Sequence, residues 1–133
     1  MKTIRATSIA AITAMTLVVS VFAAEHTKDS LKTVKEKVEA KKAVLTDVRD
    51  KLEWDEGHIE GAVFLPLSEL KAGVDPKKLA EKLPKGKIIY THCVVGKRSL
   101  AAGDILEKLG YEVRPLMDGY EELLEAGFKK AKK

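Results

Sequence analysis

The sequence predicts an α/β domain: a small parallel sheet of about four to five strands, flanked by helices on both faces. Two observations support this fold class. Short apolar runs alternate along the chain with segments whose apolar residues recur every three or four positions, and strands alternating with helices imply a parallel sheet covered on both faces. The chain has 133 residues, which is enough for one core of this kind and not for two.

The first 23 residues predict a secretory signal peptide. Lys2 and Arg5 precede an apolar run over residues 6–21, and small residues follow up to Ala23, which is the layout of a cleaved export signal. We therefore expect residues 24–133 to form the folded domain and to be exported to the periplasm. The alternative is an uncleaved membrane anchor, because the apolar run approaches the roughly 18 residues at which a membrane span begins.

Caps and apolar spacing predict the helices. Asp29 or Ser30 caps the first helix, which has an apolar seam through Val38. Asp75 caps another, with Pro76 at its first position. Further helical segments are expected around residues 52–55, inside a charged loop over 50–61, and over 68–70, 76–82, 97–109 and 120–126. In the helix over 97–109 the expected buried positions are Leu100, Ile105, Leu106 and Leu109.

Four short apolar runs predict the strands. They cover residues 43–48, 62–65, 87–92 and 113–116. The third run leads directly into Cys93, so this residue is expected at the carboxyl end of a parallel strand, where the reactive groups of such sheets gather. His92 precedes it and is expected to pack on the opposite face of the sheet.

The charge balance argues against a nucleic-acid-binding domain. The chain has 24 basic and 20 acidic residues, and removal of Lys2 and Arg5 leaves 22 basic residues, so residues 24–133 are nearly neutral. The lysine-rich tail over residues 128–133 is predicted to be a solvated, frayed end, and aromatic residues do not interleave with the basic ones.

Cys93 is the only cysteine of the chain. It has no partner for an intramolecular disulfide, and one cysteine with three scattered histidines is a poor zinc site, so no metal site is predicted. Such a cysteine is either a small buried residue or a thiol kept for its reactivity. The residues that follow favour reactivity.

The loop after Cys93 has the composition of an anion-binding turn. Gly96 permits the positive φ that lets several amide groups turn inward, and the positive end of the following helix reinforces this nest. Lys97 and Arg98 add positive charge at the rim. A thiolate or persulfide anion on Cys93 would be stabilised there.

At this point the residues resemble a known family. The run Cys93-x-x-Gly96-x-Arg98-Ser99 resembles the active-site loop of rhodanese domains. Three other motifs are similar to the family's: Leu45-Thr46-Asp47-Val48-Arg49, Glu53-Trp54-x-x-Gly57-His58-Ile59-x-Gly61-Ala62, and Gly119-Tyr120 followed by Ala126-Gly127. The resemblance covers about residues 30–128, and four motifs in order are far more specific than one.

The resemblance implies a sulfurtransferase. A donor, thiosulfate or a persulfide, passes its sulfane sulfur to Cys93, and the Cys93 persulfide passes it to cyanide, a thiol or a protein acceptor; no metal or organic cofactor is implied. The substrate-binding residues expected are Val94, Val95, Gly96, Lys97, Arg98 and Ser99, with Asp47 at the pocket floor. Arg49 is expected to pair with Glu53 or Glu60. Membrane association is expected only through an uncleaved signal segment.

Two alternatives remain at this point. The same loop fits a non-catalytic carrier that receives a persulfide and delivers it to a protein. A related phosphatase is the weaker alternative, because its loop has five residues between the cysteine and the arginine, whereas four separate Cys93 from Arg98 here.

Two departures from the family pattern lead to specific expectations. Val94 and Val95 are apolar where many rhodanese loops carry a polar or charged residue after the cysteine. Thiosulfate is therefore expected to bind less well than in loops with a cation there, and a larger or less charged persulfide is expected to be the preferred donor. Pro115 lies in the last predicted strand and lacks the N–H that a central strand needs. We therefore expect that strand at an edge of the sheet, with no long strand before Asp29.

Overall fold

The computed structural model describes residues 11, 14, 16 and 23–133. The predicted signal peptide therefore lies outside the described residues except at a few positions, and its cleavage stays a prediction. Within the described part of the chain, no helix is long and apolar enough to cross a membrane.

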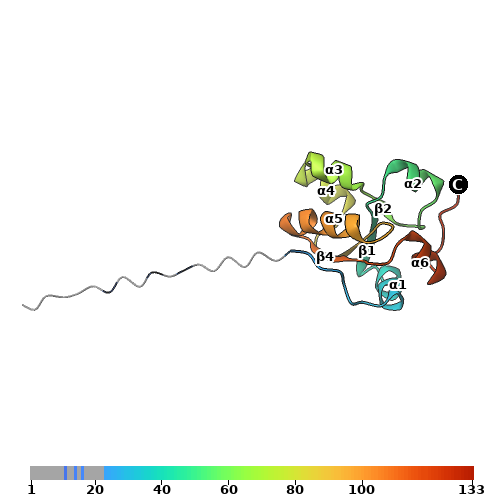
Figure 1. Cartoon of the computed structure of the whole chain (residues 1–133), viewed down its shortest axis with the longest axis horizontal. Coiled ribbons are helices and arrows are strands. Elements are labelled where there is room, and N and C mark those ends of the chain that lie inside the picture. The colour runs from blue at the N-terminus through green and yellow to red at the C-terminus, as the bar shows by residue number, and fades with distance from the viewer. Residues whose placement is uncertain (1–10, 12–13, 15, 17–22) are drawn as a thin grey trace, which may run out of the picture.

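The domain is built on a four-stranded parallel sheet (Figure 1). Its strands are β1 (Ala43–Asp47), β2 (Val63–Phe64), β3 (Ile88–His92) and β4 (Glu112–Pro115). The order across the sheet is β2-β1-β3-β4, so β1 and β3 are central. The α/β fold class predicted from the alternation of strands and helices is confirmed.

Six helices connect and cover the strands within residues 23–133. They are α1 (Leu31–Glu39), α2 (Lys51–Glu56), α3 (Leu67–Ala72), α4 (Pro76–Lys82), α5 (Lys97–Lys108) and α6 (Tyr120–Glu125). The predicted caps are confirmed: the side chain of Ser30 accepts a hydrogen bond from the Thr33 amide, and that of Asp75 accepts one from the Lys77 amide. The charged loop predicted over 50–61 holds a full helix, α2, because Asp50 and Glu53 form a capping box at its start.

The helices cover both faces of the sheet. One core contains Leu70 of α3, Leu79 of α4 and Leu106 of α5 together with Ile89 of β3. The other contains residues of α1 and α6 together with the next residue of β3, Tyr90. Adjacent residues of a strand point to opposite faces, so β3 supplies both cores. Figure 1 shows the two layers, with α3, α4 and α5 on one side and α1 and α6 on the other.

Strand β4 is an edge strand, as Pro115 predicted. The amide of Leu116 donates to Thr91 of β3, which is the inner side of β4, whereas the carbonyl of Pro115 faces outward and accepts from the Thr27 amide at 2.8 Å. The nitrogen of Pro115 faces the same outer side, because the N and C=O groups of one strand residue point the same way. Residues 23–29 contain no strand, so no ladder needs the missing N–H.

The predicted buried face of α5 and the predicted tail were each right in part. Of the four apolar positions predicted for that face, Leu106 is fully buried, Ile105 and Leu109 are partly buried against the same core, and Leu100 is half-buried. Gly103 lets α5 approach β4 closely, since a Cβ there would lie 2.6 Å from the Pro115 ring. The lysine-rich tail is not frayed throughout, because the Ala131 amide donates to the His58 carbonyl at 2.8 Å.

Candidate active site

Cys93 lies directly after β3, at the carboxyl edge of the parallel sheet. It is a free cysteine with a residue exposure of 1%. The structure places it in the core shared with α3, α4 and α5. The thiol is therefore held at the base of the loop that joins β3 to α5, as the sequence predicted for a residue at a strand end.

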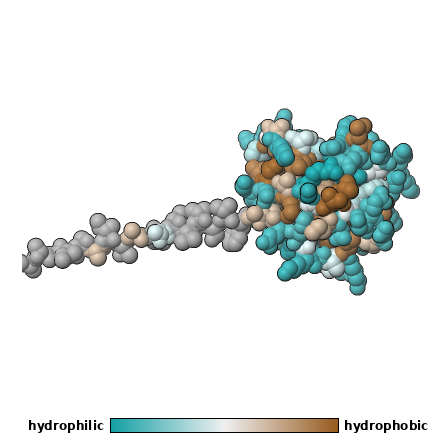
Figure 2. Space-filling model, in the orientation of Figure 1, coloured by the Kyte–Doolittle hydropathy of each residue, from teal (hydrophilic) through white to brown (hydrophobic). Residues whose placement is uncertain are grey.

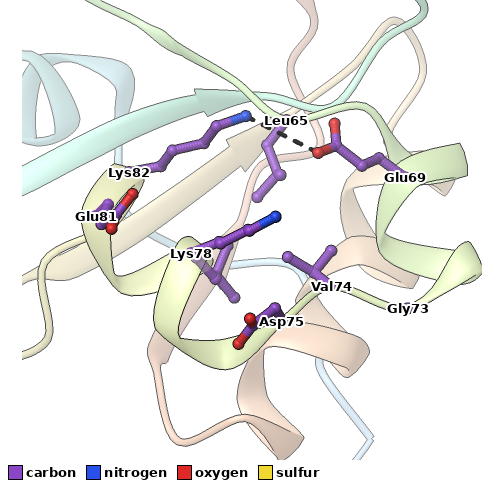
Figure 3. A pocket seen from close by; sticks show the side chains of 9 residues that line it. Leu65, Glu69, Gly73, Val74, Asp75, Lys78, Glu81 and Lys82 are labelled. Atoms are coloured by element: carbon purple, nitrogen blue, oxygen red, sulfur yellow. Dashed lines mark ion pairs between the residues drawn. The ribbon is translucent and has the colours of Figure 1, made fainter.

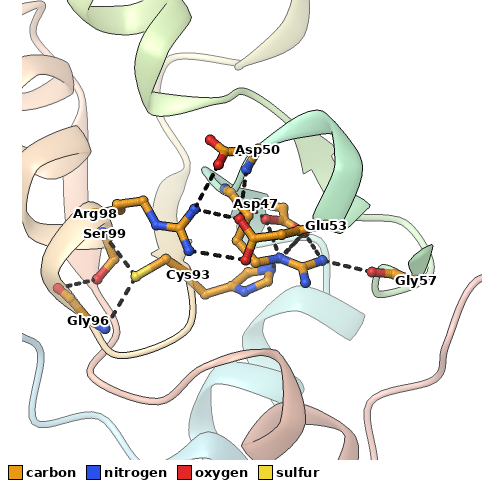
Figure 4. A network of polar contacts seen from close by, with 10 residues as sticks. Asp47, Asp50, Glu53, Gly57, Cys93, Gly96, Arg98 and Ser99 are labelled. Atoms are coloured by element: carbon orange, nitrogen blue, oxygen red, sulfur yellow. Dashed lines mark hydrogen bonds and ion pairs between the residues drawn. The ribbon is translucent and has the colours of Figure 1, made fainter. Parts of the chain in front are cut away.

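Two backbone amides point at the sulfur of Cys93. The Gly96 amide lies 3.2 Å and the Ser99 amide 3.4 Å from Sγ (Figure 4). Gly96 makes this possible with a φ of 86°, which is in the left-handed region that favours glycine. Both donors lie at the start of α5, whose dipole is positive at this end. A negative charge on the sulfur is therefore stabilised by the backbone.

The charge of Arg98 is largely neutralised by acidic neighbours. Its guanidinium donates to both carboxylate oxygens of Glu53, at 2.6 and 3.1 Å, and Asp50 lies 3.7 Å away (Figure 4). The hydrogen bond from Arg98 lowers the pKa of Glu53, and the same bond raises the pKa of Arg98. Lys97, in contrast, is exposed and forms no ion pair among the described residues. The two cations that the sequence predicted at the rim therefore differ in their availability.

Asp47 and Arg49 form a buried pair, which corrects two expectations. The Arg49 guanidinium donates to both Asp47 oxygens, from Nε to Oδ1 at 3.0 Å and from Nη2 to Oδ2 at 2.8 Å, and to the Gly57 carbonyl at 2.7 Å. Arg49 therefore pairs with Asp47, and neither Glu53 nor Glu60 is its partner. Because Asp47 is fully buried with both oxygens engaged, it holds Arg49 in place instead of lining an open pocket floor.

His92 is fully buried beside the Asp47–Arg49 pair. Its Nε2 lies 3.7 Å from Oδ2 of Asp47. Burial disfavours the charged imidazolium, which lowers the pKa of His92 to about 4 despite the nearby carboxylate. The ring is therefore neutral near pH 7, and its full burial agrees with the packing role predicted from the sequence.

The rest of the rim is apolar and lies beside a small hollow. Val94 and Val95 are 45% and 68% exposed. A hollow of about 380 Å³ opens next to Val94, between α2 and α6. It is lined by Arg49, Glu53, Glu56, Gly57, Val94, Tyr120, Glu121 and Lys130. This hollow can receive the part of a donor or acceptor that does not react.

Gly119 is packed against the backbone of the Cys93 loop. A Cβ at this position would lie 2.2 Å from the Val94 carbonyl oxygen, and the neighbouring Tyr120 amide donates to the Cys93 carbonyl at 3.1 Å. The residues at the start of α6 therefore support the backbone of the loop at Cys93 and Val94. The sequence singled out Gly119-Tyr120 as a motif, but spacing alone did not reveal this contact.

A second hollow, of about 590 Å³, lies between α3 and α4 (Figure 3). Leu65, Val74 and Leu79 line it, and an ion pair of 3.9 Å joins Lys82 to Glu69 at its side. No residue of the Cys93 loop lines it. In the part of the chain that the structure describes, no three His, Cys, Asp or Glu residues gather as metal ligands would.

Comparison with known proteins identifies the family and shows related sulfur chemistry. The rhodanese-like domain family model matches residues 30–126. The chain is 39% identical over 71 residues to a probable adenylyltransferase/sulfurtransferase, MoeZ, of Mycobacterium tuberculosis, covering 53% of this chain and 17% of that protein. It is 32% identical to the thiosulfate sulfurtransferase PspE of Escherichia coli, covering 49% and 59%, and 33% identical to the putative sulfur carrier protein YrkF of Bacillus subtilis, covering 62% and 42%. The chain thus spans less than two thirds of each of these relatives.

Solved structures share the fold. A rhodanese-related protein of Thermoplasma volcanium has a TM-score of 0.64 and 24% identity, covering 84% of this chain and 100% of that chain. The human single-domain sulfurtransferase TSTD1 has a TM-score of 0.58 and 28% identity, covering 71% and 92%. The similarity to the first structure supports the fold alone. The second structure is of a protein named as a sulfurtransferase.

Proposed function

We propose that this chain, which belongs to the rhodanese-like domain family, is a sulfurtransferase that carries sulfane sulfur as a persulfide on Cys93. The observation that carries the proposal is the pair of amides, from Gly96 and Ser99, that point at Sγ at the start of α5. Relatives with sulfurtransferase in their names support sulfur transfer in general. We also propose a persulfide or thiosulfate as the donor, cyanide or a thiol as the acceptor, and the periplasm as the location.

The reaction has two displacement steps. The Cys93 thiolate attacks the sulfane sulfur of the donor, a new S–S bond forms, and the donor's own S–S bond breaks with its electron pair leaving on sulfite or on a thiolate. An acceptor such as cyanide or a thiolate then attacks the outer sulfur of the persulfide. The bond between the two sulfurs breaks, and its electron pair returns to Cys93. The loop amides stabilise the negative charge at the start and at the end of this cycle.

The loop favours a donor with little charge. Val94 and Val95 are exposed and apolar, and Glu53 neutralises Arg98, so a dianion such as thiosulfate meets only Lys97 as an unpaired cation on the loop within the described residues. An alkyl persulfide is a monoanion near pH 7, so it carries less charge than thiosulfate and loses less hydration on entering such a site. We therefore propose an organic persulfide as the preferred donor.

Steady-state assays with cyanide as the acceptor test the donor preference. We expect a higher kcat/KM for an alkyl persulfide, a monoanion, than for the thiosulfate dianion. Equal or better performance of thiosulfate would reject the preference and leave the Cys93 chemistry intact. Cys93→Ser is the control for both donors, because it removes the nucleophile while keeping the loop's length.

A carrier that serves a protein acceptor is the second candidate, and the resemblance to a putative sulfur carrier protein supports it. Turnover separates the two candidates. An enzyme releases sulfur to cyanide or a small thiol over many cycles, whereas a carrier forms one persulfide per chain and then stops. Multiple turnovers with small acceptors would exclude the carrier.

A further inference from the structure

Residues 24–29 form an extended segment, called here the N-terminal strap, that runs along the outer side of β4 towards α1 (Figure 1). The Ala24 nitrogen donates to Oδ1 of Asp104 on α5 at 2.6 Å, and the Thr27 amide donates to Pro115. At its other end Asp29 accepts from the Tyr90 hydroxyl and from Arg114, and the hydrogen bond from Tyr90 contributes most to lowering the pKa of Asp29. The strap is therefore fixed to the domain at both ends.

Between these anchors, His26 of the strap contacts the Cys93 loop. Its Nε2 lies 2.8 Å from the carbonyl oxygen of Gly96. A carbonyl can only accept, so Nε2 carries the proton of this hydrogen bond. The approach is close, since a Cβ on Gly96 would lie 2.8 Å from the same Nε2. The residue whose amide points at the sulfur of Cys93 is thus held through its carbonyl by a side chain from outside the loop.

The hydrogen bond from His26 also affects which carbonyl the Ser99 hydroxyl can donate to. The Ser99 hydroxyl lies 2.8 Å from the Gly96 carbonyl oxygen and 2.7 Å from the Leu116 carbonyl oxygen, but it has one proton to donate. Leu116 is buried, and Ser99 is the donor that the structure gives its carbonyl within the described residues. The Gly96 carbonyl has other donors, His26 and, at 3.3 Å, the amide of Leu100.

We propose that His26 is a positioning residue for Cys93, a role that rests on the sulfurtransferase function proposed above. By donating to Gly96, His26 leaves the Ser99 hydroxyl free for Leu116. The amides of Gly96 and Ser99 then keep a single orientation toward the Cys93 sulfur. Without the imidazole, the Ser99 proton is shared between two carbonyls, and the start of α5 loses a fixed orientation over the sulfur.

Three variants of the full chain test this role. His26→Ala removes the donor, His26→Gln keeps an N–H donor at a similar reach, and Glu25→Ala is the control because Glu25 is an exposed neighbour in the same strap. Loss of one hydrogen bond predicts that kcat for persulfide transfer falls about two- to tenfold in His26→Ala, with KM for the donor unchanged. His26→Gln is expected to recover most of the loss, and Glu25→Ala to match the unaltered protein.

Hydrogen exchange of the loop gives a readout that does not depend on sulfur chemistry. The amides of residues 94–99 are expected to exchange faster in His26→Ala than in the unaltered protein or in His26→Gln. Suppose that the unaltered protein transfers no sulfur but that the loop still exchanges faster in His26→Ala than in the unaltered protein and in His26→Gln. The proposed function then fails, while the positioning role of His26 stands. Equal loop exchange and equal kcat in His26→Ala and Glu25→Ala would overturn the positioning role, as would a loss that glutamine does not recover.

Discussion

Arg98 and Glu53 form a two-bond ion pair across the entrance to the Cys93 loop, with distances of 2.6 and 3.1 Å. The two side chains are each 30% exposed, so the pair lies at the rim and not in the core. Arg98 is the one arginine of the loop, and its pKa is raised chiefly by the hydrogen bond to Glu53 and to a smaller extent by a negative charge on Cys93. Glu53 therefore sets how much positive charge an incoming anion meets.

Replacing Glu53 should improve the use of anionic donors. In Glu53→Gln the Arg98 charge is no longer neutralised by Glu53, although Asp50 remains at 3.7 Å, and glutamine still serves the capping box of α2. Because the pair is partly exposed and screened, we expect KM for thiosulfate to fall only by about two- to fivefold. KM for an alkyl persulfide, which is a monoanion, should fall less than KM for thiosulfate. Steady-state kinetics with both donors measure the difference.

Glu56→Gln is the matched control for that experiment. Glu56 lines the same hollow, but no ion pair joins it to Arg98 among the described residues. An equal fall in KM for thiosulfate in Glu56→Gln would show that net charge, and not release of Arg98, is responsible.

His92 should make the fold sensitive to mild acid. Its pKa is about 4 in the folded protein against 6.5 for the free side chain, so between these values the unfolded state binds a proton that the folded state does not. Stability is therefore lost as pH falls from about 6.5 towards about 4, by on the order of 3 kcal/mol in total. Urea unfolding across this range measures the loss. His92→Leu should lose less stability over the same range, and an unchanged pH dependence would contradict the assignment.

Gly119 should tolerate no side chain. Its φ of −103° is open to any residue, so the cost of Gly119→Ala comes from the contact with the Val94 carbonyl and not from backbone strain. We expect a loss of about 1–3 kcal/mol in the free energy of unfolding, with slower sulfur transfer because the loop must shift. Gly73→Ala is the control, since its Cβ would meet open space but its φ of 96° strains an alanine, so it costs stability without touching the Cys93 loop; equal transfer rates in the two variants would argue against a link to the loop.

Cleavage of the predicted signal peptide after Ala23 should turn an existing hydrogen bond into an ion pair. The Ala24 nitrogen already lies 2.6 Å from Asp104, and in the processed chain it would be a charged amino terminus. Intact-mass measurement of the exported protein should show a chain that begins at Ala24. Asp104→Asn should then lower its stability by up to about 1 kcal/mol, whereas Glu107→Gln, at an exposed position of the same helix, should not. A different amino terminus would contradict this account.

Much of the fold could be predicted because it depends on local patterns. Ser30 and Asp75 mark helix starts by their own side chains, and the apolar runs give the four strands within one or two residues. Pro115 even indicated an edge strand, since its missing N–H excludes a central position. Each of these signals lies within a short stretch of sequence, and each follows from the chemistry of the residues in that stretch alone.

The side-chain pairs could not be predicted in the same way. Arg49 had several acidic neighbours in sequence, and only the register of the strand and the position of α2 decide that Asp47 is its partner and that Glu53 pairs with Arg98. His26 lies 70 residues before Gly96, and nothing in its local sequence points to the loop. The signal that could have helped is Gly96 itself, because a glycine next to a reactive cysteine indicates a close neighbour as well as an unusual φ.

The central claim is that Cys93 carries the transferred sulfur, and intact-mass spectrometry of the protein after exposure to a donor tests it most directly. With thiosulfate or an alkyl persulfide, the account predicts a gain of one sulfur atom, removed by cyanide or by a reducing thiol. Cys93→Ser should show no gain under the same conditions. A protein that stays unmodified with every donor, or a serine variant that gains sulfur, would contradict the account.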